Sequence, residues 1–400
     1  MRVGNMATVN QPVSLAASTA GAIDPVAQAP ARNLALDGLR GIAVLAVLVY
    51  HFWPGVLPGG FLGVDLFFVL SGYLITSGLR RGARSGRFPD LRSFFSRRAR
   101  RLLPAMMLVL VVSTALALLA AGQLPAGLRW QWAGAVTYTS NWMQIAQGSS
   151  YFASMEPLYF QHFWSLAVEE QFYLLWPLVL ALLAWLLRSR RALAGGILVL
   201  AAASAASMAW GFDPSKDSSV LYFGTWTHGF GLLLGAAGAV LGERSGPAAV
   251  AVPRRKWTLI QLSQVLVLVA MLAGFRLLPD TSATAYRGGM ALFCLLGTLL
   301  VLTLNRPGTL VHSLLSLKFL RWWGSRSCGL YLWHWPLLLL ATTVFPPQAV
   351  TAAVLCTIPL VILAAELSWR FVEEPILRHG FRAAIADWHH RVADRVKRVW

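Results

Sequence analysis

The chain has 400 residues, of which 57% are hydrophobic and only 12% are charged. Soluble globular domains carry about 25% charged residues, so this composition excludes an ordinary water-soluble domain. Its three cysteines are dispersed and have neither the pattern of a disulfide framework nor the ligand spacing of a zinc site, so we expect no metal; they are Cys294, Cys328 and Cys356.

Ten apolar stretches are long enough to cross a bilayer, which takes about 20 helical residues. We therefore expect an all-α, polytopic integral membrane protein with about ten transmembrane helices. These lie near residues 36–53, 61–79, 103–121, 171–187, 192–210, 221–242, 258–275, 288–304, 329–345 and 350–370. Around this membrane domain (34–378) we expect a disordered cytoplasmic tail at 1–33 and a basic cytoplasmic tail at 379–400.

The lysines and arginines are distributed unequally between the loops. When the loops are assigned alternately to two sides, starting from a cytoplasmic N-terminus, 30 of the 34 fall on that first side. Positive residues are retained in the cytoplasm, so both termini are expected there, with the protein in the cell inner (plasma) membrane. The net charge of +18 also favours anionic membrane lipids, and it requires no nucleic-acid partner.

Polar side chains inside apolar spans are functional candidates, because burying an ionisable group in hydrocarbon is costly. Arg40 and His51 lie 11 residues apart in the first span, which is about three helical turns, so they should share one helix face. Asp65 begins the second span, and the turn at 58–60 should bring it to the depth of His51. A carboxylate there would orient the imidazole; alternatively, Asp65 caps its own helix.

Four arginines precede the third span, in the 80–102 loop. Arginine forms bidentate hydrogen bonds to phosphate, which suits a phosphorylated cofactor or, alternatively, lipid headgroups. They are Arg97, Arg98, Arg100 and Arg101.

The longest segment expected on the outer side, 122–165, is rich in aromatic residues, which include Trp142, Tyr151 and Trp164. They suit either an interfacial belt or stacking platforms for a sugar or lipid acceptor. The segment leads into a helix on which three polar residues share one face, although capping of that helix is an alternative role for the first of them. These three are Ser165, Glu169 and Tyr173.

Six motifs occur in order between about residues 34 and 378. Together they resemble the acyltransferase-3 family of membrane O-acyltransferases. The motifs are Arg40 with His51, GVDLFFVLSGY at 63–73, the arginine cluster before LLP at 102–104, WSLAVEEQFY at 164–173, LYLWHWP at 330–336 and WRFVEEP at 369–375.

The resemblance implies a ten-helix enzyme that transfers an acyl group, often acetyl, from cytoplasmic acyl-CoA to a hydroxyl of an envelope carbohydrate or glycolipid. Acyl-CoA is then a co-substrate, and no tightly bound cofactor is expected. Some family members carry an additional C-terminal esterase-like domain, which we expect this chain to lack. Acylation of a natural-product sugar fits the same motifs. The alternative of another class is a transporter or flippase, which the scarcity of Gly- or Pro-broken helices in matching halves argues against.

The resemblance also implies roles for the candidate residues. Arg40 and His51 match the pair taken as essential in the family, with His51 as general base and Asp65 or Glu169 orienting it. We expect the donor to be held by Arg40 and the arginine cluster (Arg97, Arg98, Arg100, Arg101). His334 is expected either to line the donor path or to lie at the inner membrane interface. Candidates for acceptor binding are Trp142, Trp164, Ser165 and Tyr173.

Overall fold

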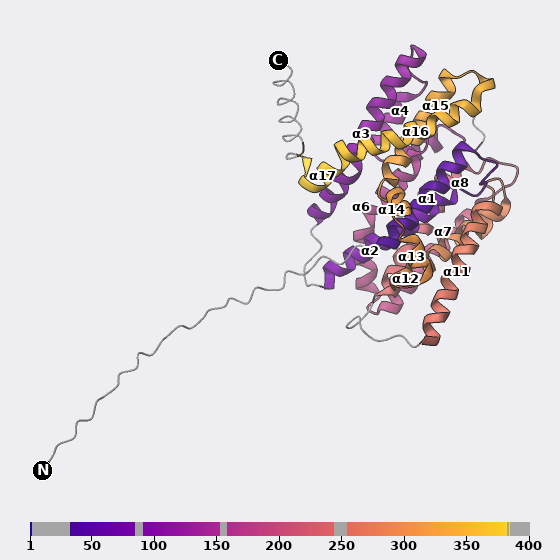
Figure 1. The fold of residues 1–400 in the computed structure, drawn as a ribbon. Coiled ribbons are helices and arrows are strands. Elements are labelled where there is room, and N and C mark those ends of the chain that lie inside the picture. The colour runs from indigo at the N-terminus through magenta and orange to yellow at the C-terminus, as the bar shows by residue number, and fades with distance from the viewer. Residues whose placement is uncertain (2–32, 85–90, 153–157, 244–253, 382–383, 385–400) are drawn as a thin grey trace. The chain divides into compact units, whose positions relative to one another are not determined.

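The computed structural model describes residues 1, 33–84, 91–152, 158–243, 254–381 and 384. The chain divides into two units, Met1–Asn33 and Leu34–Trp400. The expected N-terminal tail and most of the expected 379–400 tail lie outside the described residues. The described part of the second unit contains helices and no β-strand, which confirms the all-α prediction (Figure 1).

The helices follow one another closely along the chain. Those of the first half are α1 (Leu34–Phe52), α2 (Leu62–Arg84), α3 (Leu91–Ala121), α4 (Leu128–Val136), α5 (Ser140–Ala146), α6 (Phe163–Leu186) and α7 (Arg190–Gly211). Next come α8 (Ser219–Phe223), α9 (Thr225–His228), α10 (Phe230–Gly242), α11 (Arg254–Leu277), η1 (Ala285–Gly289) and α12 (Met290–Leu304). The last are α13 (Leu310–Leu315), α14 (Lys318–Ser325), α15 (Ser327–Val344), η2 (Pro347–Ala349), α16 (Val350–Ser368), η3 (Trp369–Glu373) and α17 (Glu374–His379).

Eight helical stretches in the described residues are long and apolar enough to cross a membrane. They coincide with eight of the ten expected spans. The other two correspond to α10, which has 13 residues, and α15, which has 18. α15 is less apolar because its first half contains tyrosine, tryptophan and histidine side chains. The fold is therefore that of a multi-pass membrane protein, and the number of crossings stays a prediction.

The expectation of one continuous helix over 221–242 is wrong. The structure has three helices there, α8, α9 and α10, and the break between the first two falls at Gly224, whose ψ of 125° is extended. Glycine carries a low helix propensity, and Gly229 marks the second break. The broken segment places polar groups of α8 and α9 inside the protein, where Thr227 and His228 are buried.

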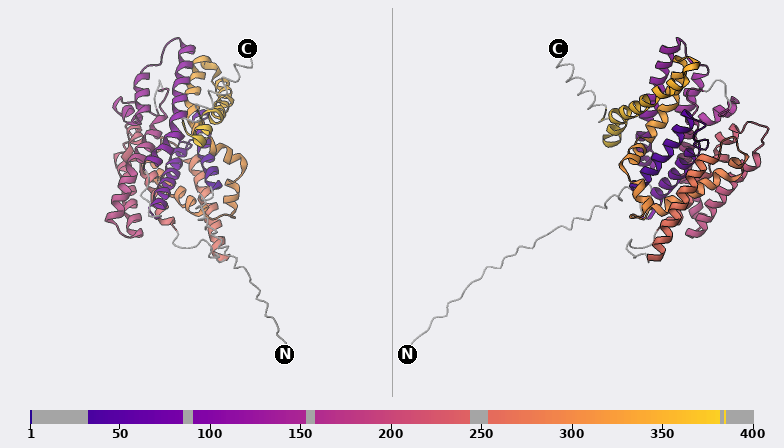
Figure 2. Two further views of the ribbon diagram at one scale, coloured as in Figure 1. Left: turned by 90° about the vertical axis from the view of Figure 1, so that its left-hand side faces the viewer. Right: turned by 45° about the vertical axis from the view of Figure 1, so that its right-hand side comes forward.

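The first helix lies among several partners and buries residues on most of its sides. It contacts α2, α14 and α15. Figure 2 shows α1 and α2 from two further directions, together with the later helices that pack beside them. α10 packs closely on α2, and α15 packs on both α3 and α16. These contacts bring α1, α2, α3, α6 and α15 around one interior space.

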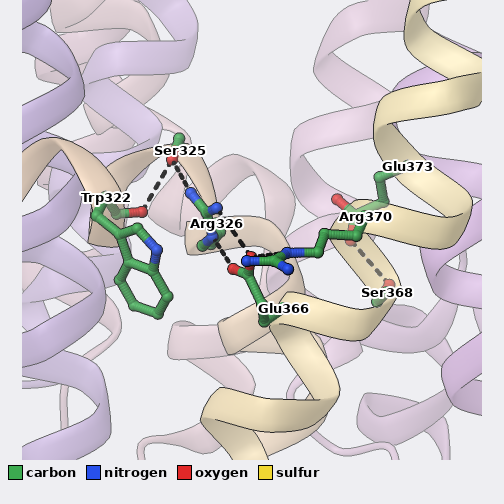
Figure 3. A network of polar contacts seen from close by, with 7 residues as sticks. All are labelled: Trp322, Ser325, Arg326, Glu366, Ser368, Arg370 and Glu373. Carbon is green, nitrogen blue, oxygen red and sulfur yellow. Dashed lines mark hydrogen bonds and ion pairs between the residues drawn. The ribbon is translucent and has the colours of Figure 1, made fainter.

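An ionic network ties the start of α15 to the end of α16 (Figure 3). Arg326 forms a bidentate ion pair with Glu366, with one N–O distance of 3.2 Å, and Arg370 pairs with the same carboxylate. Beside it, the Ser368 hydroxyl donates to Glu373 (2.8 Å). The carboxylates of Glu366 and Glu373 both have hydrogen-bonding partners, so these contacts stabilise the junction between α15 and α16.

Candidate active site

The main cavity lies between α1, α2, α3, α6 and α15. Its empty volume is about 650 Å³, which includes its open mouth. Three cations and two carboxylates from three helices face it, so charged groups lie in a cavity that is otherwise lined by apolar side chains. Its lining includes Arg40, Arg98, Arg101, Glu169, Glu170, Tyr173, Ser165, Ser327 and Tyr331.

The predicted arginine cluster divides into two pairs. It lies on α3, which begins at Leu91 rather than after the cluster, so the expected loop is helical here. Arg98 and Arg101 are three residues apart, share a helix face and both line the cavity. The Arg98 guanidinium also lies 4.0 Å from the centroid of the Tyr173 ring, a cation–π contact.

The other two arginines point elsewhere. Arg97 is exposed and donates to the Ser93 hydroxyl one turn earlier. The guanidinium of Arg100 lies against Gly380, just after α17. The expectation that all four line one anion site is therefore wrong, because only Arg98 and Arg101 reach the cavity, whereas Arg97 and Arg100 contact other parts of the protein.

Arg40 lines the same cavity and contacts α2 and α15. Its Nη2 donates to Ser327 Oγ at 3.3 Å, and its guanidinium lies 5.6 Å from the centroid of the Phe67 ring. Among the described residues, the bond to Ser327 is the one hydrogen bond that the Arg40 side chain makes. Arg40 therefore keeps N–H donors available to a ligand in the cavity.

Arg40 and His51 share one face of α1, as their spacing predicts. Both meet α15: Arg40 contacts Ser327 at its start, and Nδ1 of His51 lies 3.2 Å from Nε2 of His334 two turns later. The two helices consequently run in the same direction. The His51 ring also lies 4.9 Å from the ring of Trp335.

The hydrogen bonds of His51 determine which ring nitrogen carries its proton. Nδ1 of His334 lies 2.5 Å from the carbonyl of Tyr331, which can only accept, so Nε2 of His334 carries the lone pair. Nδ1 of His51 faces that lone pair and the Val47 carbonyl at 3.0 Å, so Nδ1 is the donor. The lone pair of His51 is then on Nε2, which lies 3.1 Å from the Tyr151 hydroxyl.

The expected partners of His51 are wrong. Glu169 accepts from the hydroxyls of Ser71 and Tyr173 inside the cavity. Asp65 is fully buried and its Oδ1 lies 3.0 Å from Nε2 of His228 on α9. The orienting contact to His51 comes from a second histidine, His334, instead of from a carboxylate.

Helix geometry explains why Asp65 turns away from His51. Gly63 packs so closely on α1 that an added Cβ would lie 2.4 Å from the Ala43 carbonyl oxygen. Asp65 comes two residues later, about 200° around the helix. Gly72, two turns beyond Asp65 on the same face, packs against Leu232 of α10. The aspartate therefore faces α9 and α10, on the side away from α1.

Ser165 and Tyr331 line the cavity, and Tyr331 is the lining residue of α15 nearest in the chain to His334. Their hydroxyl oxygens are 2.7 Å apart, and the Tyr331 hydroxyl donates to the carbonyl of His162 at 2.9 Å. The backbone of Tyr331 in turn holds His334. One turn of α15 thus separates Tyr331, which lines the cavity, from the imidazole pair formed by His51 and His334.

The predicted acceptor residues do not form one surface. Trp164 has no exposed area and packs on Tyr222 and His228, and Tyr173 is also buried, so both lie in the interior. Trp142 is half-buried, stacks near Trp226 and donates to Gln171 at 3.2 Å. The sequence predicted that these aromatic side chains face the membrane interface or an acceptor. In the structure, Trp164 and Tyr173 instead pack in the protein interior.

Four residues that the structure brings to the site had no assigned role in the sequence. Tyr151 stood among the aromatic residues of its segment, and its pairing with His51 is a long-range contact that no local pattern encodes. His162 and Tyr331 lie in or beside recognised motifs. His228 is an ionisable residue within an apolar stretch. Such residues are costly to bury, and this rule would have marked His228 as a candidate.

The fold and the site define a multi-pass membrane protein with a charged cavity, one of whose lining residues, Tyr331, lies one helical turn from a buried histidine pair. A family model described as an acyltransferase domain matches residues 33–369. The chain therefore belongs to the acyltransferase-3 family of membrane acyltransferases, which confirms the resemblance seen in its motifs.

Curated relatives agree with this assignment. The chain is 36% identical to "Peptidoglycan O-acetyltransferase OatA" of Listeria monocytogenes, over 86% of this chain and 56% of the relative. It is 37% identical to "Putative peptidoglycan O-acetyltransferase YrhL" of Bacillus subtilis, over 87% of this chain and 55% of the relative. The chain thus spans little more than half the length of these relatives. No solved structure matches it.

Proposed function

We propose that this chain is a membrane O-acetyltransferase that moves an acetyl group from cytoplasmic acyl-CoA to a hydroxyl of an envelope carbohydrate. The names of two relatives point to peptidoglycan as the acceptor. The observation that carries the proposal is the cavity. Its lining includes Arg98 and Arg101 on α3 and Tyr331 on α15, and Tyr331 lies one helical turn from the His51–His334 pair.

The donor fits this cavity by its charge pattern. Arg98 and Arg101 supply bidentate donors for the phosphates of the nucleotide. The pantetheine arm then extends past Arg40, whose remaining N–H groups suit its amide carbonyls. This places the thioester toward Ser165 and Tyr331. The Tyr331 proton is committed to the carbonyl of His162, so the donor for the oxyanion that forms in the transition state is the Ser165 hydroxyl, which turns to it from Tyr331.

His51 then acts as the general base. Its Nε2 accepts the proton of the acceptor hydroxyl, and the oxygen attacks the thioester carbonyl. The carbon–sulfur bond breaks, and the thiolate of CoA takes up the proton. The atoms balance without a covalent acyl-enzyme, so direct transfer is the simplest route.

The acceptor approaches from the opposite end of the bundle. The Tyr151 hydroxyl marks the position beside the lone pair of His51 that an acceptor hydroxyl must reach. The orientation predicted from the loop charges supports this route: the arginine end then faces the cytoplasm, where acyl-CoA is made, and Tyr151 lies on the envelope side of the inner (plasma) membrane.

The test uses purified protein in lipid vesicles with radiolabelled acetyl-CoA and muropeptide acceptors. Wild-type protein should transfer label to the acceptor, and His51→Ala should lose this by roughly 10²–10⁴-fold, the usual contribution of a general base. The matched control is His379→Ala, an exposed histidine at the end of α17. Wild-type protein that neither transfers nor hydrolyses the donor would overturn the function, and an active, folded His51→Ala protein would overturn the role of His51.

A further inference from the structure

The buried pair Asp65–His228 lies outside the cavity. Both side chains have no exposed area, and the two atoms Oδ1 and Nε2 are 3.0 Å apart. Nδ1 of His228 lies 2.8 Å from the carbonyl of Tyr222, so this nitrogen must be the donor. One proton therefore lies between His228 and Asp65, and the pair joins α2 to α8.

The short helix α8 is the platform on which Tyr151 rests. The backbone N–H of Tyr151 donates to Ser219 Oγ at 2.7 Å, at the start of α8. The ring of Tyr222, near the end of α8, lies 5.0 Å from the ring of Tyr151. The His228 ring packs on Tyr222 at 4.7 Å. Tyr151 is thus held at its backbone and its ring by a helix that His228 fixes.

The helix α8 has only five residues, too few to be stable without contacts to the rest of the protein. Isolated helices shorter than about 12–15 residues are marginal in water, so α8 depends on tertiary contacts. Three side chains hold its last turn by its carbonyl groups: His228 binds that of Tyr222, Asn141 donates to that of Phe223 at 3.0 Å, and Thr227 donates to that of Leu221 at 2.6 Å. Of these three, His228 is itself held by a buried carboxylate.

We propose that Asp65 and His228 are positioning residues, which fix α8 so that the Tyr151 hydroxyl lies at the lone pair of His51. This inference rests on the proposed function for its effect on turnover, because Tyr151 occupies the position that the acceptor hydroxyl must reach. Its effect on the geometry at His51 is independent of that function.

The decisive experiment is a double-mutant cycle between His228 and Tyr151. His228→Leu should lower the transfer turnover by roughly tenfold or more, as expected for residues that are coupled through a shared partner, here Tyr222, and leave the affinity for acetyl-CoA unchanged. In a Tyr151→Phe background the same change should have little further effect. Additive losses would overturn the proposal, because His228 would then act without Tyr151.

Conservative variants separate positioning from folding. Asp65→Asn retains a donor for Nε2 of His228 and should keep most of the turnover, whereas Asp65→Leu should lose as much as His228→Leu. The stability control is Thr76→Ala, which removes another buried contact of α2, to Trp176 Nε1 (2.8 Å). It should lower the thermal midpoint without the loss of turnover. A loss in Asp65→Asn equal to that in Asp65→Leu would overturn the proposal.

A readout without catalysis keeps this inference separate from the proposed function. Diethyl pyrocarbonate modifies unprotonated imidazole nitrogen, and mass spectrometry measures its rate at His51. The rate should rise in His228→Leu to that of Tyr151→Phe, and should stay at the wild-type value in Asp65→Asn and Thr76→Ala. An unchanged rate in His228→Leu would overturn the positioning role even in an active enzyme. Inactive wild-type protein that shows the expected rates would overturn the function alone.

Discussion

Nδ1 of His51 and Nε2 of His334 meet at 3.2 Å, across a sequence separation of 283 residues. The donor in this contact is His51, because the Tyr331 carbonyl already takes the proton of His334 Nδ1. A histidine here does what a carboxylate does in many general-base sites: it fixes the tautomer and the ring orientation. In a bilayer interior a neutral partner avoids burying a second charge.

In the proposed mechanism, His334 acts on catalysis through His51. We expect His334→Ala to lower turnover by roughly 10- to 100-fold, the loss that corresponds to one buried hydrogen bond of about 1–3 kcal/mol, with acetyl-CoA affinity unchanged. Single-turnover kinetics together with equilibrium binding measure the two quantities. A weaker affinity with unchanged turnover would instead support the donor-path role expected from the sequence.

The division of the arginine cluster predicts a contrast between two pairs on one helix. Replacing Arg98 and Arg101 with Gln should weaken acetyl-CoA binding by roughly a hundredfold or more, at about 1.5–3 kcal/mol for each charged hydrogen bond. Replacing exposed Arg92 and Arg97 with Gln removes the same charge and should leave affinity near the wild-type value. Binding is measured in neutral detergent, without anionic lipid.

Equal affinities of these two double variants would contradict a donor site at the mouth of the cavity. The cluster would then act on lipid headgroups, and its loss should appear in membrane insertion or stability. The next cytoplasmic candidates for a donor anchor are Arg321 and Arg326, although Arg326 is already paired with Glu366.

The loop charges predict the orientation of the whole chain. A reporter fused after Arg101 should read as cytoplasmic, and one inserted near Ser149 should read as external, because positive residues stay inside. Paired activity reporters with opposite compartment requirements measure this. The reverse pair of readings would put the arginine end outside and remove the access of acyl-CoA to the cavity.

The network at Glu366 should contribute to stability (Figure 3). The Arg326–Glu366 pair is only 16% exposed on either side, and Glu366→Gln should cost about 1–3 kcal/mol because it leaves two guanidinium groups without their carboxylate. The control is Glu374→Gln in the exposed pair with Arg378, which should cost about 0.3–0.5 kcal/mol. Thermal unfolding in detergent compares the two, and equal midpoints would contradict a structural role for this network.

Several features followed from the sequence because they depend on local physics. The length of an apolar run and the cost of burying charge are properties of the chain itself, so the all-helical membrane fold was predictable. The shared face of Arg40 and His51 followed from 3.6 residues per turn. The same periodicity does not separate Arg98 and Arg101 from Arg97 and Arg100, because Arg97 and Arg101 are four residues apart and share a face.

Only the tertiary structure decided which polar groups meet. Asp65 points away from His51 because close packing at Gly63 commits one face of α2 to α1, and Asp65 lies on another face. The break at Gly224 that lets His228 reach Asp65 depends on partners in α2 and α8. His51 is oriented by His334 and faces Tyr151, residues far along the chain. A helix pattern gives the direction of a side chain around its own axis, whereas its partner depends on how neighbouring helices pack.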